Sequence, residues 1–180
     1  IDTLRLSGHF GVYTKDGLKE TDLKNFFTAK EFYIDKPKTV IDDLIFDGYL
    51  FFAGKIRLRK EIELDKTDVS LKITGRIHFA KLYVNGKYVG DYMFNDTLDI
   101  SEFAKQGKNE IEVELLTGSR NLFGPFHDKR KIESFWVGPS SFSFYGRWNN
   151  FKCDDYTSAY SFARAGIFEC DGQFRVVVDY

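Results

Sequence analysis

Apolar and polar residues alternate along much of this 180-residue chain, as they do in β-strands that bury one face. The alternation is already under way at Leu4, so we expect an excerpt of a longer, multidomain protein. An Asn85-Gly86 pair offers the two positive φ angles of a type I′ turn, which predicts a hairpin of residues 80–84 and 87–93. The predicted strands cover Leu4 to Val12, Ile56 to Leu64, Val69 to Ile73, Ala80 to Val84, Ile111 to Leu115, Phe142 to Phe144, Tyr160 to Phe162 and Val176 to Val178.

Two short stretches have helical rather than alternating patterns. Thr21 is placed to cap a helix whose Leu23, Phe26 and Phe27 would share one face. Ser101 is placed to cap a turn that continues to Lys105 and that a glycine ends. One or two short helices are therefore expected beside the strands.

Composition favours one β-rich domain over residues 1–180. Aromatic residues make up 17% of the chain, with 19 Phe and 10 Tyr, and such residues suit the packing of β-sheets. A chain of this length forms one well-developed core, and no Pro/Gly/Ser-rich linker divides it. Cys153 and Cys170 are either two free thiols or one disulfide, and the sequence leaves both open.

The charge balance argues against nucleic acid as a partner. Lysine and arginine total 26 against 27 acidic residues, so the chain has no basic field that would attract phosphates. The sequence also lacks an apolar run of the ~18 residues that cross a bilayer, so we expect no membrane partner.

A series of short motifs follows the predicted hairpin in a fixed order. We expect Asp99 and Ser101 to hold the free amides of a helical turn, and Gly107 and Asn109 to adopt left-handed conformations that restart a strand. The motifs are Val84-Asn85-Gly86, Val89-Gly90, Leu98-Asp99-Ile100-Ser101, Gly107-Lys108-Asn109 and the alternating Ile111-Val113-Leu115.

This ordered run resembles the sugar-binding domain of glycoside hydrolases of the family 2 type. The flanking segments 48–54, 119–127 and 146–168 resemble a subset of large bacterial glycosidase-like proteins, so the resemblance covers roughly residues 44–170. It implies an all-β fold, a galactose-binding-domain-like jelly-roll β-sandwich. It also implies that catalysis belongs to a separate (β/α)₈ barrel of roughly 250 residues that carries two glutamates.

The expected function is therefore that of a non-catalytic accessory domain of a glycoside hydrolase, which binds sugar or braces the catalytic domain. An independent carbohydrate-binding module or lectin is the alternative. We expect no catalytic residue in this chain, because Glu61, Glu63, Glu112 and Glu114 alternate with apolar residues as on a solvated sheet face. The expected partner is a carbohydrate or the catalytic domain of the same parent chain.

Sugar binding needs a flat aromatic surface for the ring and planar polar groups for the hydroxyls. Three segments meet this description; the alternative for each is core or interdomain packing, with Arg120 and Asn121 fixing a loop by bonding backbone carbonyls. We expect the loop after residue 116 to project, because a rigid strand precedes it. The candidates are Arg120, Asn121, Phe126 and His127 in this loop, Arg147, Trp148 and Asn149 further on, and Tyr49 between two glycines.

No cofactor is expected from the sequence. The three histidines are too far apart in the sequence for a zinc motif. Asn95, Asp96 and Asp99 could offer oxygen ligands to a structural calcium ion, but a turn built from Asx side chains is the alternative that we favour.

Overall fold

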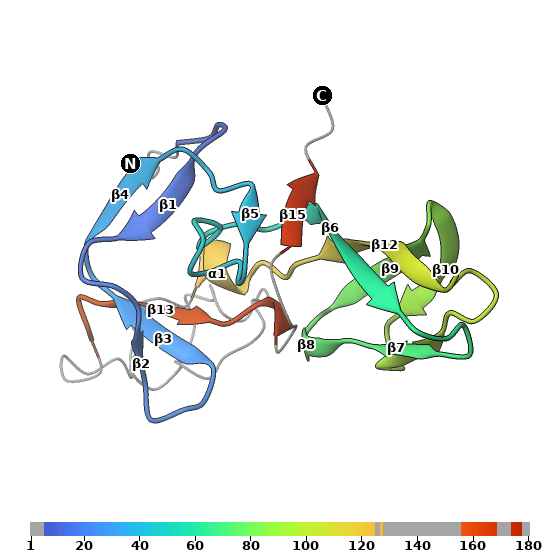
Figure 1. Ribbon diagram of the computed structural model, residues 1–180. Helices are drawn as coiled ribbons and strands as arrows, with labels where there is room; N and C mark the ends of the chain where they lie inside the picture. Colours follow the sequence, from blue (N-terminus) through green and yellow to red (C-terminus); the bar gives the residue numbers. More distant parts are fainter. Residues whose placement is uncertain (1–5, 125–126, 128–155, 169–173, 178–180) are drawn as a thin grey trace.

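A computed structural model describes residues 6–124, 127, 156–168 and 174–177 of the chain (Figure 1). Nearly all regular structure in this part is β, which confirms the all-β fold class, and the one helix within it is the single turn α1 (Arg120–Phe123). The strands are β1 (Gly11–Thr14), β2 (Lys19–Glu20), β3 (Phe26–Ala29), β4 (Phe32–Asp35), β5 (Val40–Ile41), β6 (Lys55–Leu64), β7 (Ser70–Lys72), β8 (Thr74–Arg76), β9 (Phe79–Val84), β10 (Lys87–Tyr92), β11 (Thr97–Asp99), β12 (Gly107–Leu116), β13 (Tyr160–Ala163), β14 (Gly166–Phe168) and β15 (Phe174–Val177).

The largest sheet has six antiparallel strands in the order β10-β9-β12-β6-β15-β5. Its central strands β6 and β12 pair along their whole length, from Lys55 opposite Leu116 to Leu64 opposite Gly107. Residues alternate between the faces, so one face is apolar, while the other carries arginines of β6 beside glutamates of β12. This alternation is the periodicity that the sequence displays.

The apolar face of this sheet is covered by the strand pairs β7–β11 and β8–β14, which together with the sheet form a sandwich (Figure 1). Leu71 of β7, Leu98 of β11 and Ile167 of β14 pack into the same cluster as the sheet. We call this cluster the sandwich core. Its buried members are Ile41, Leu44, Ile56, Leu58, Ile73, Ala80, Leu82, Val84, Tyr92, Ile100, Ile111, Val113, Leu115, Ile167 and Val176.

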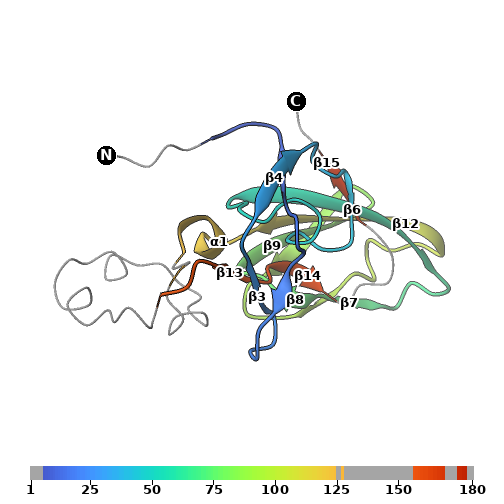
Figure 2. The ribbon, with the colours of Figure 1, turned by 90° about the vertical axis from the view of Figure 1, so that its left-hand side faces the viewer.

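A second apolar cluster lies at the opposite end of the molecule from β7 and β10 (Figure 1), where the sheet β13-β3-β2 and the antiparallel pair β1–β4 are found. Figure 2 shows the molecule from this end. Its rings meet edge to face: the centroid of Phe51 lies 5.1 Å from that of Phe162 and 5.4 Å from that of Phe32. We call it the aromatic cluster. Its members are Phe27, Ala29, Ile45, Leu50 and Phe162, with Leu18, Phe32, Phe51 and Tyr160 packed against them.

The segment from Leu44 to Phe52, which we call the linking segment, contributes to both clusters in turn. Leu44, Tyr49 and Phe52 join the sandwich core, whereas Ile45, Leu50 and Phe51 join the aromatic cluster. Gly48 makes this possible, because it reverses the chain with a φ of 99°, which other residues rarely adopt. The aromatic residues of this segment therefore connect the two clusters.

The predicted hairpin is confirmed. Strands β9 and β10 are joined by Asn85 and Gly86, with φ angles of 51° and 78°, as a type I′ turn requires. The register shifts between Tyr88 and Gly90, so β10 contains a bulge.

The prediction of a helix after Thr21 is wrong. Thr21 Oγ1 instead accepts the Leu23 N–H in a tight turn, Asn25 takes a φ of 67°, and Phe26 and Phe27 enter strand β3. Both phenylalanines are buried, one on each face of the strand. A strand covered on both sides has consecutive apolar residues, which a short helix also displays, so the sequence pattern did not separate the two.

Two details around the motif run, and one in the N-terminal segment, differ from expectation. A single turn forms after Ile100, whose carbonyl accepts the N–H groups of Phe103 and Ala104, and Asp99 caps it by accepting the Ser101 N–H at 2.9 Å. Gly107 has the expected positive φ, but Asn109 does not; it is fully buried and acts through its side chain. In the N-terminal segment the described strand begins only at Gly11.

Among the described residues, no helix has the length and apolarity that a membrane span requires.

Candidate functional site

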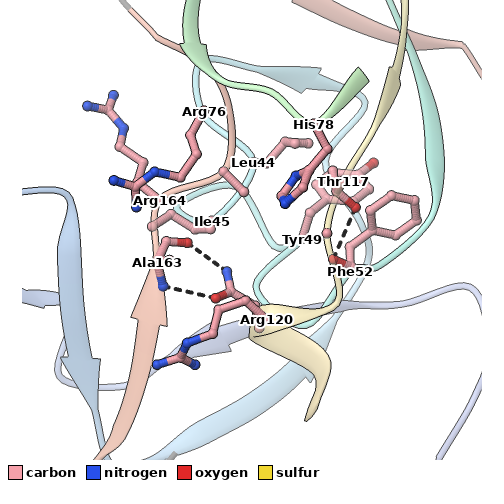
Figure 3. A pocket seen from close by; sticks show the side chains of 13 residues that line it. Leu44, Ile45, Tyr49, Phe52, Arg76, His78, Thr117, Arg120, Ala163 and Arg164 are labelled. Carbon is pink, nitrogen blue, oxygen red and sulfur yellow. Dashed lines mark hydrogen bonds between the residues drawn. The ribbon is translucent and has the colours of Figure 1, made fainter. Parts of the chain in front are cut away.

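Three of the candidate residues, Tyr49, Arg120 and Asn121, line one small cavity where the sandwich core meets the aromatic cluster (Figure 3). Arg76, which follows Gly75 in β8, and His78 close the cavity from the sandwich side. The remaining lining comes from Leu44, Ile45, Phe52, Thr117, Gly118, Ala163, Arg164 and Ala165. The junction was not visible in the sequence, because its residues come from segments more than 100 positions apart.

Arg120 binds the edge of strand β13. Its guanidinium donates from Nη1 to the carbonyl of Ser161 at 3.0 Å and from Nη2 to Ser161 Oγ at 2.8 Å. The residue is only 5% exposed, and burial lowers the pKa of Arg120 to about 10. It therefore remains charged at neutral pH, inside the protein.

Asn121 binds the same edge two residues further along. Its Nδ2 donates to the Ala163 carbonyl at 2.8 Å, and its Oδ1 accepts the Ala163 N–H at 2.9 Å. The side-chain amide thus pairs with the backbone as another peptide group would. Because β13 is the last strand of its sheet, Arg120 and Asn121 together occupy an edge that would otherwise be open.

These contacts differ from the projecting loop that we expected after residue 116. Both polar side chains are buried rather than exposed, and both bond backbone carbonyls, which is the packing alternative that the sequence left open. The physical reason is that the loop turns into α1 at once, which lays its first residues against β13. A role for them in contacting carbohydrate or a neighbouring domain stays a prediction.

A partly buried ion pair crosses the same junction. Arg164 donates from Nε to Asp43 Oδ2 at 2.5 Å, and Asp43 Oδ1 accepts the Ile45 N–H at 3.0 Å. Burial raises the pKa of Asp43, although the bond to Arg164 opposes this. The pair ties the end of β13 to the segment that links the two clusters.

The cavity itself is small. Its volume is about 20 Å³, which is room for about one water molecule. Arg76 places its guanidinium 5.0 Å from the ring centroid of Phe26, and burial lowers the pKa of Arg76. The junction, which we call the seam, is therefore tightly packed and orders β13, α1 and the linking segment. Its cavity is too small for a sugar.

Tyr49 contributes mainly to packing. Its hydroxyl donates to the Lys38 carbonyl at 2.9 Å, its ring meets Phe52 edge to face, and burial raises the pKa of its phenol. His127 lies away from the seam: its Nδ1 is 2.9 Å from the Thr157 carbonyl, and its ring stands edge-on to Tyr160 at 4.5 Å.

The remaining candidates, Phe126, Arg147, Trp148 and Asn149, lie outside the described residues, as do Cys153, Cys170 and the strand expected at 142–144. Two of the residues considered for calcium have other partners: Asp96 pairs with Lys72 at 2.9 Å, and Asp99 accepts the Ser101 hydroxyl at 2.5 Å. Within the described part of the chain, no three potential metal ligands gather.

A larger hollow near the aromatic cluster was not predicted from the sequence. It is a groove of about 480 Å³ between the antiparallel pair β1–β4 and the linking segment. Tyr13, Tyr33, Asp35, Lys38 and Phe46 are among its lining residues. The available signal was the spacing of Tyr33 and Asp35, which places both on one face of a strand.

No protein-family model matches this chain. Two solved structures are similar to it in part. The β-D-glucuronidase of Dictyoglomus thermophilum is 17% identical, with a TM-score of 0.35 over 62% of this chain and 20% of that enzyme. The rhamnosidase of Novosphingobium sp. PP1Y is 17% identical, with a TM-score of 0.38 over 89% of this chain and 16% of that enzyme. The chain thus spans a fifth or less of the length of each of these two glycoside hydrolases.

Proposed function

We propose that this chain is a non-catalytic β-sandwich module of a carbohydrate-active enzyme of the glycoside hydrolase type, which shapes or braces the part that performs the chemistry. The observation that carries the proposal is the motif run between Val84 and Leu115. Its residues resemble the family 2 type of sugar-binding domain, and in this chain they form one hydrogen-bonded unit.

The centre of that unit is a pair of asparagines. Asn85 Nδ2 donates to Asn109 Oδ1 at 2.9 Å and to the Phe103 carbonyl at 2.9 Å, while Asn85 Oδ1 accepts the Glu110 N–H. Asn109 also binds the N–H and carbonyl groups of Lys105 at 2.9 and 2.7 Å. The two side chains thereby hold the hairpin turn, the helical turn and the start of β12 together.

This arrangement explains why the order of the motifs is informative. Asn85 and Asn109 bond to each other and to backbone groups of the helical turn and of β12, so the separation of these two motifs is constrained by geometry and not by local preference alone. A chance match to one motif would not reproduce these contacts. The network therefore supports the resemblance on which the proposal rests.

The acidic residues on the sheet support a non-catalytic role. Glu112 of β12 accepts Arg59 Nη2 at 2.7 Å and lies 3.4 Å from Arg57 Nη1, on the outer face of the six-stranded sheet. Glu114 Oε2 lies 3.9 Å from Arg57 Nε and 3.5 Å from Lys55 Nζ. A glycosidase needs a proton-donating carboxyl and a nucleophile or base that face each other across a cleft, and these glutamates instead lie on one face of the same strand, mostly buried beside arginines.

The parent gene provides the direct test. We expect it to encode a glycosidase barrel in addition to this chain, and we expect the whole protein, but not the purified chain, to hydrolyse aryl glycosides. Deletion of residues 1–180 from the whole protein should lower its thermal stability or raise its KM. A parent gene without a barrel, or turnover by the chain alone, would overturn the proposal.

A further inference from the structure

The groove beside the antiparallel pair β1–β4 differs from the cavity of the seam in size and in exposure. Its volume of about 480 Å³ lies within the range of roughly 300–1,000 Å³ that is typical of ligand sites, whereas the seam holds about 20 Å³. Ile45 and Leu18 contribute apolar lining, and the exposed Phe46 stands at its side. The groove can therefore admit a molecule that the seam excludes.

One wall of the groove is a pair of stacked tyrosines. Tyr13 and Tyr33 are directly opposite each other in the β1–β4 register, with ring centroids 5.5 Å apart and planes inclined by 26°. Because opposite residues of an antiparallel pair share one face, both rings belong to the same surface. Tyr33 is 45% exposed and is the accessible ring of the two.

The inner ring is held rigidly. Tyr13 Oη donates to the Lys36 carbonyl at 2.8 Å. Its ring lies against Gly11 and Gly48 so closely that a Cβ at either position would come within 2.7 or 2.6 Å of the phenol. Tyr33 therefore rests on a fixed support, which reduces the entropy that a bound ligand would have to overcome.

Polar groups of both kinds border the tyrosines. Asp35 follows Tyr33 by two positions on the same face, and its Oδ1 accepts the Lys36 N–H at 2.7 Å, which holds the carboxylate in place. Lys38 Nζ is held by Asp47 Oδ1 at 2.6 Å, and this hydrogen bond raises the pKa of Lys38. The groove thus offers an acceptor and a positioned donor of opposite charge.

We propose that this groove binds a neutral oligosaccharide, with one sugar ring stacked on Tyr33 and its hydroxyls bonded to Asp35 and Lys38. A sugar ring has an apolar face for the aromatic ring, and each hydroxyl both donates and accepts. The balance of one carboxylate against nearby lysines, one of them already paired, favours an uncharged ligand over a phosphate or a nucleic acid. The ligand class rests on the proposed function, whereas the location rests on the groove alone.

The test compares two exposed tyrosines by titration calorimetry with lactose, cellobiose, xylobiose and methyl β-galactoside as probes. Tyr33→Ala should weaken binding of the best probe by about tenfold or more, because it removes the stacking surface. Tyr88→Ala is the matched control, since Tyr88 is 50% exposed but lies on β10 in the sandwich. It should leave the affinity unchanged.

Asp35→Asn gives a second variant that keeps the shape of the groove and should also weaken binding. Thermal melts establish that each variant is folded. The inference is overturned if none of the four sugars binds at millimolar concentration, or if folded Tyr33→Ala binds as the unaltered chain does. Binding that depends on Tyr33 in a protein whose gene lacks a glycosidase barrel would uphold the groove and refute only the proposed accessory role.

Discussion

The sandwich core is built mainly from aliphatic side chains and contains a hairpin of consecutive strands, whereas the aromatic cluster is built mainly from rings and depends on a strand from a distant part of the chain. Strands β9 and β10 are separated only by Asn85 and Gly86. In the aromatic cluster, by contrast, Phe27 of β3 lies opposite Phe162 of β13. The hairpin can form locally, whereas the pairing of β13 with β3, like that of β15 with β6 in the sandwich, requires the chain to close a very long loop.

The two regions also differ in how polar groups are used. In the sandwich, ion pairs lie on the outer face of the sheet, where Arg59 meets Glu112. At the seam, Arg120, Asn121 and Asp43 are buried, and their bonds, that of Asp43 to the partly exposed Arg164 included, hold β13 in place. This difference suggests that the aromatic cluster depends on a few specific bonds, because an unsatisfied buried partner costs more than a lost surface pair.

The largest effect is expected from Phe162→Ala. Phe162 is fully buried and its ring contacts Phe32 and Phe51, so its truncation should lower the free energy of unfolding by about 3–5 kcal/mol. Leu82→Ala, at an equally buried position in the sandwich core, should cost about 2–5 kcal/mol. Urea denaturation followed by circular dichroism measures both. If Phe162→Ala costs less than about 1 kcal/mol, the aromatic cluster contributes little to the fold.

Arg120→Met should come next, at about 3 kcal/mol, because it leaves the Ser161 carbonyl and hydroxyl without their donor inside the protein. Leu122→Ala is the matched control on the same helix, where the side chain is partly exposed, and should cost less than about 1 kcal/mol. Arg120→Lys should recover only part of the loss, since an ammonium lacks the fork of the guanidinium. Equal melting temperatures for Arg120→Met and Leu122→Ala would show that the bonds across the seam are dispensable.

The sequence predicted the sandwich well and the seam poorly, for a reason visible in single residues. Ile56 to Leu64 and Ile111 to Leu115 alternate, and Asn85-Gly86 has a backbone requirement that few other pairs satisfy. These signals are local, so they could be found without knowing the fold. The same locality allowed the ordered motif run to be identified.

The seam depends on contacts that leave no periodic trace. Nothing near Arg120 or Asn121 in the sequence reveals that β13 ends a sheet and exposes its edge to them. Phe26 and Phe27 were assigned to a helix because a strand buried on both faces lacks alternation. The tyrosine groove was missed for the same reason, since Tyr13 and Tyr33 become neighbours only through the register of β1 and β4.

A smaller effect is expected from Gly48→Ala, at about 1–3 kcal/mol. The residue has a φ of 99°, and an added Cβ would lie 2.6 Å from the Tyr13 ring, so both the backbone and the ring must shift. Gly86→Ala provides the comparison, because Gly86 also has a positive φ but open space around it. Thermal denaturation should show the larger loss for Gly48→Ala; the reverse order would mean that Tyr13 is free to move.

The smallest effect concerns Asp47 and depends on pH. Burial alone would raise the pKa of Asp47, but hydrogen bonds from the Asp43 N–H, from Lys38 and from the Asp42 N–H outweigh it and hold this pKa below the ordinary 3.8. A carboxyl whose pKa is lower in the folded state stabilises the fold above its unfolded pKa, and this contribution is lost as the pH falls through the folded value. Lys38 has a raised pKa, so the stabilisation that its charge contributes is fully present below the ordinary value of 10.5 and is lost only as the pH rises beyond it.

Asp47→Asn should therefore destabilise the protein by about 1 kcal/mol at pH 7, a modest figure because Lys38 is half exposed. The amide keeps an acceptor for the two backbone N–H groups but loses the charge that faces Lys38. The difference between the variant and the unaltered chain should narrow as the pH falls toward 2, where Asp47 is protonated. Glu31→Gln, which removes the exposed Lys15–Glu31 pair, is the matched control and should cost less than about 1 kcal/mol at pH 7. Urea titrations at several pH values measure both, and a difference for Asp47→Asn that stays constant down to pH 2 would mean that its charge contributes nothing at the edge of the groove.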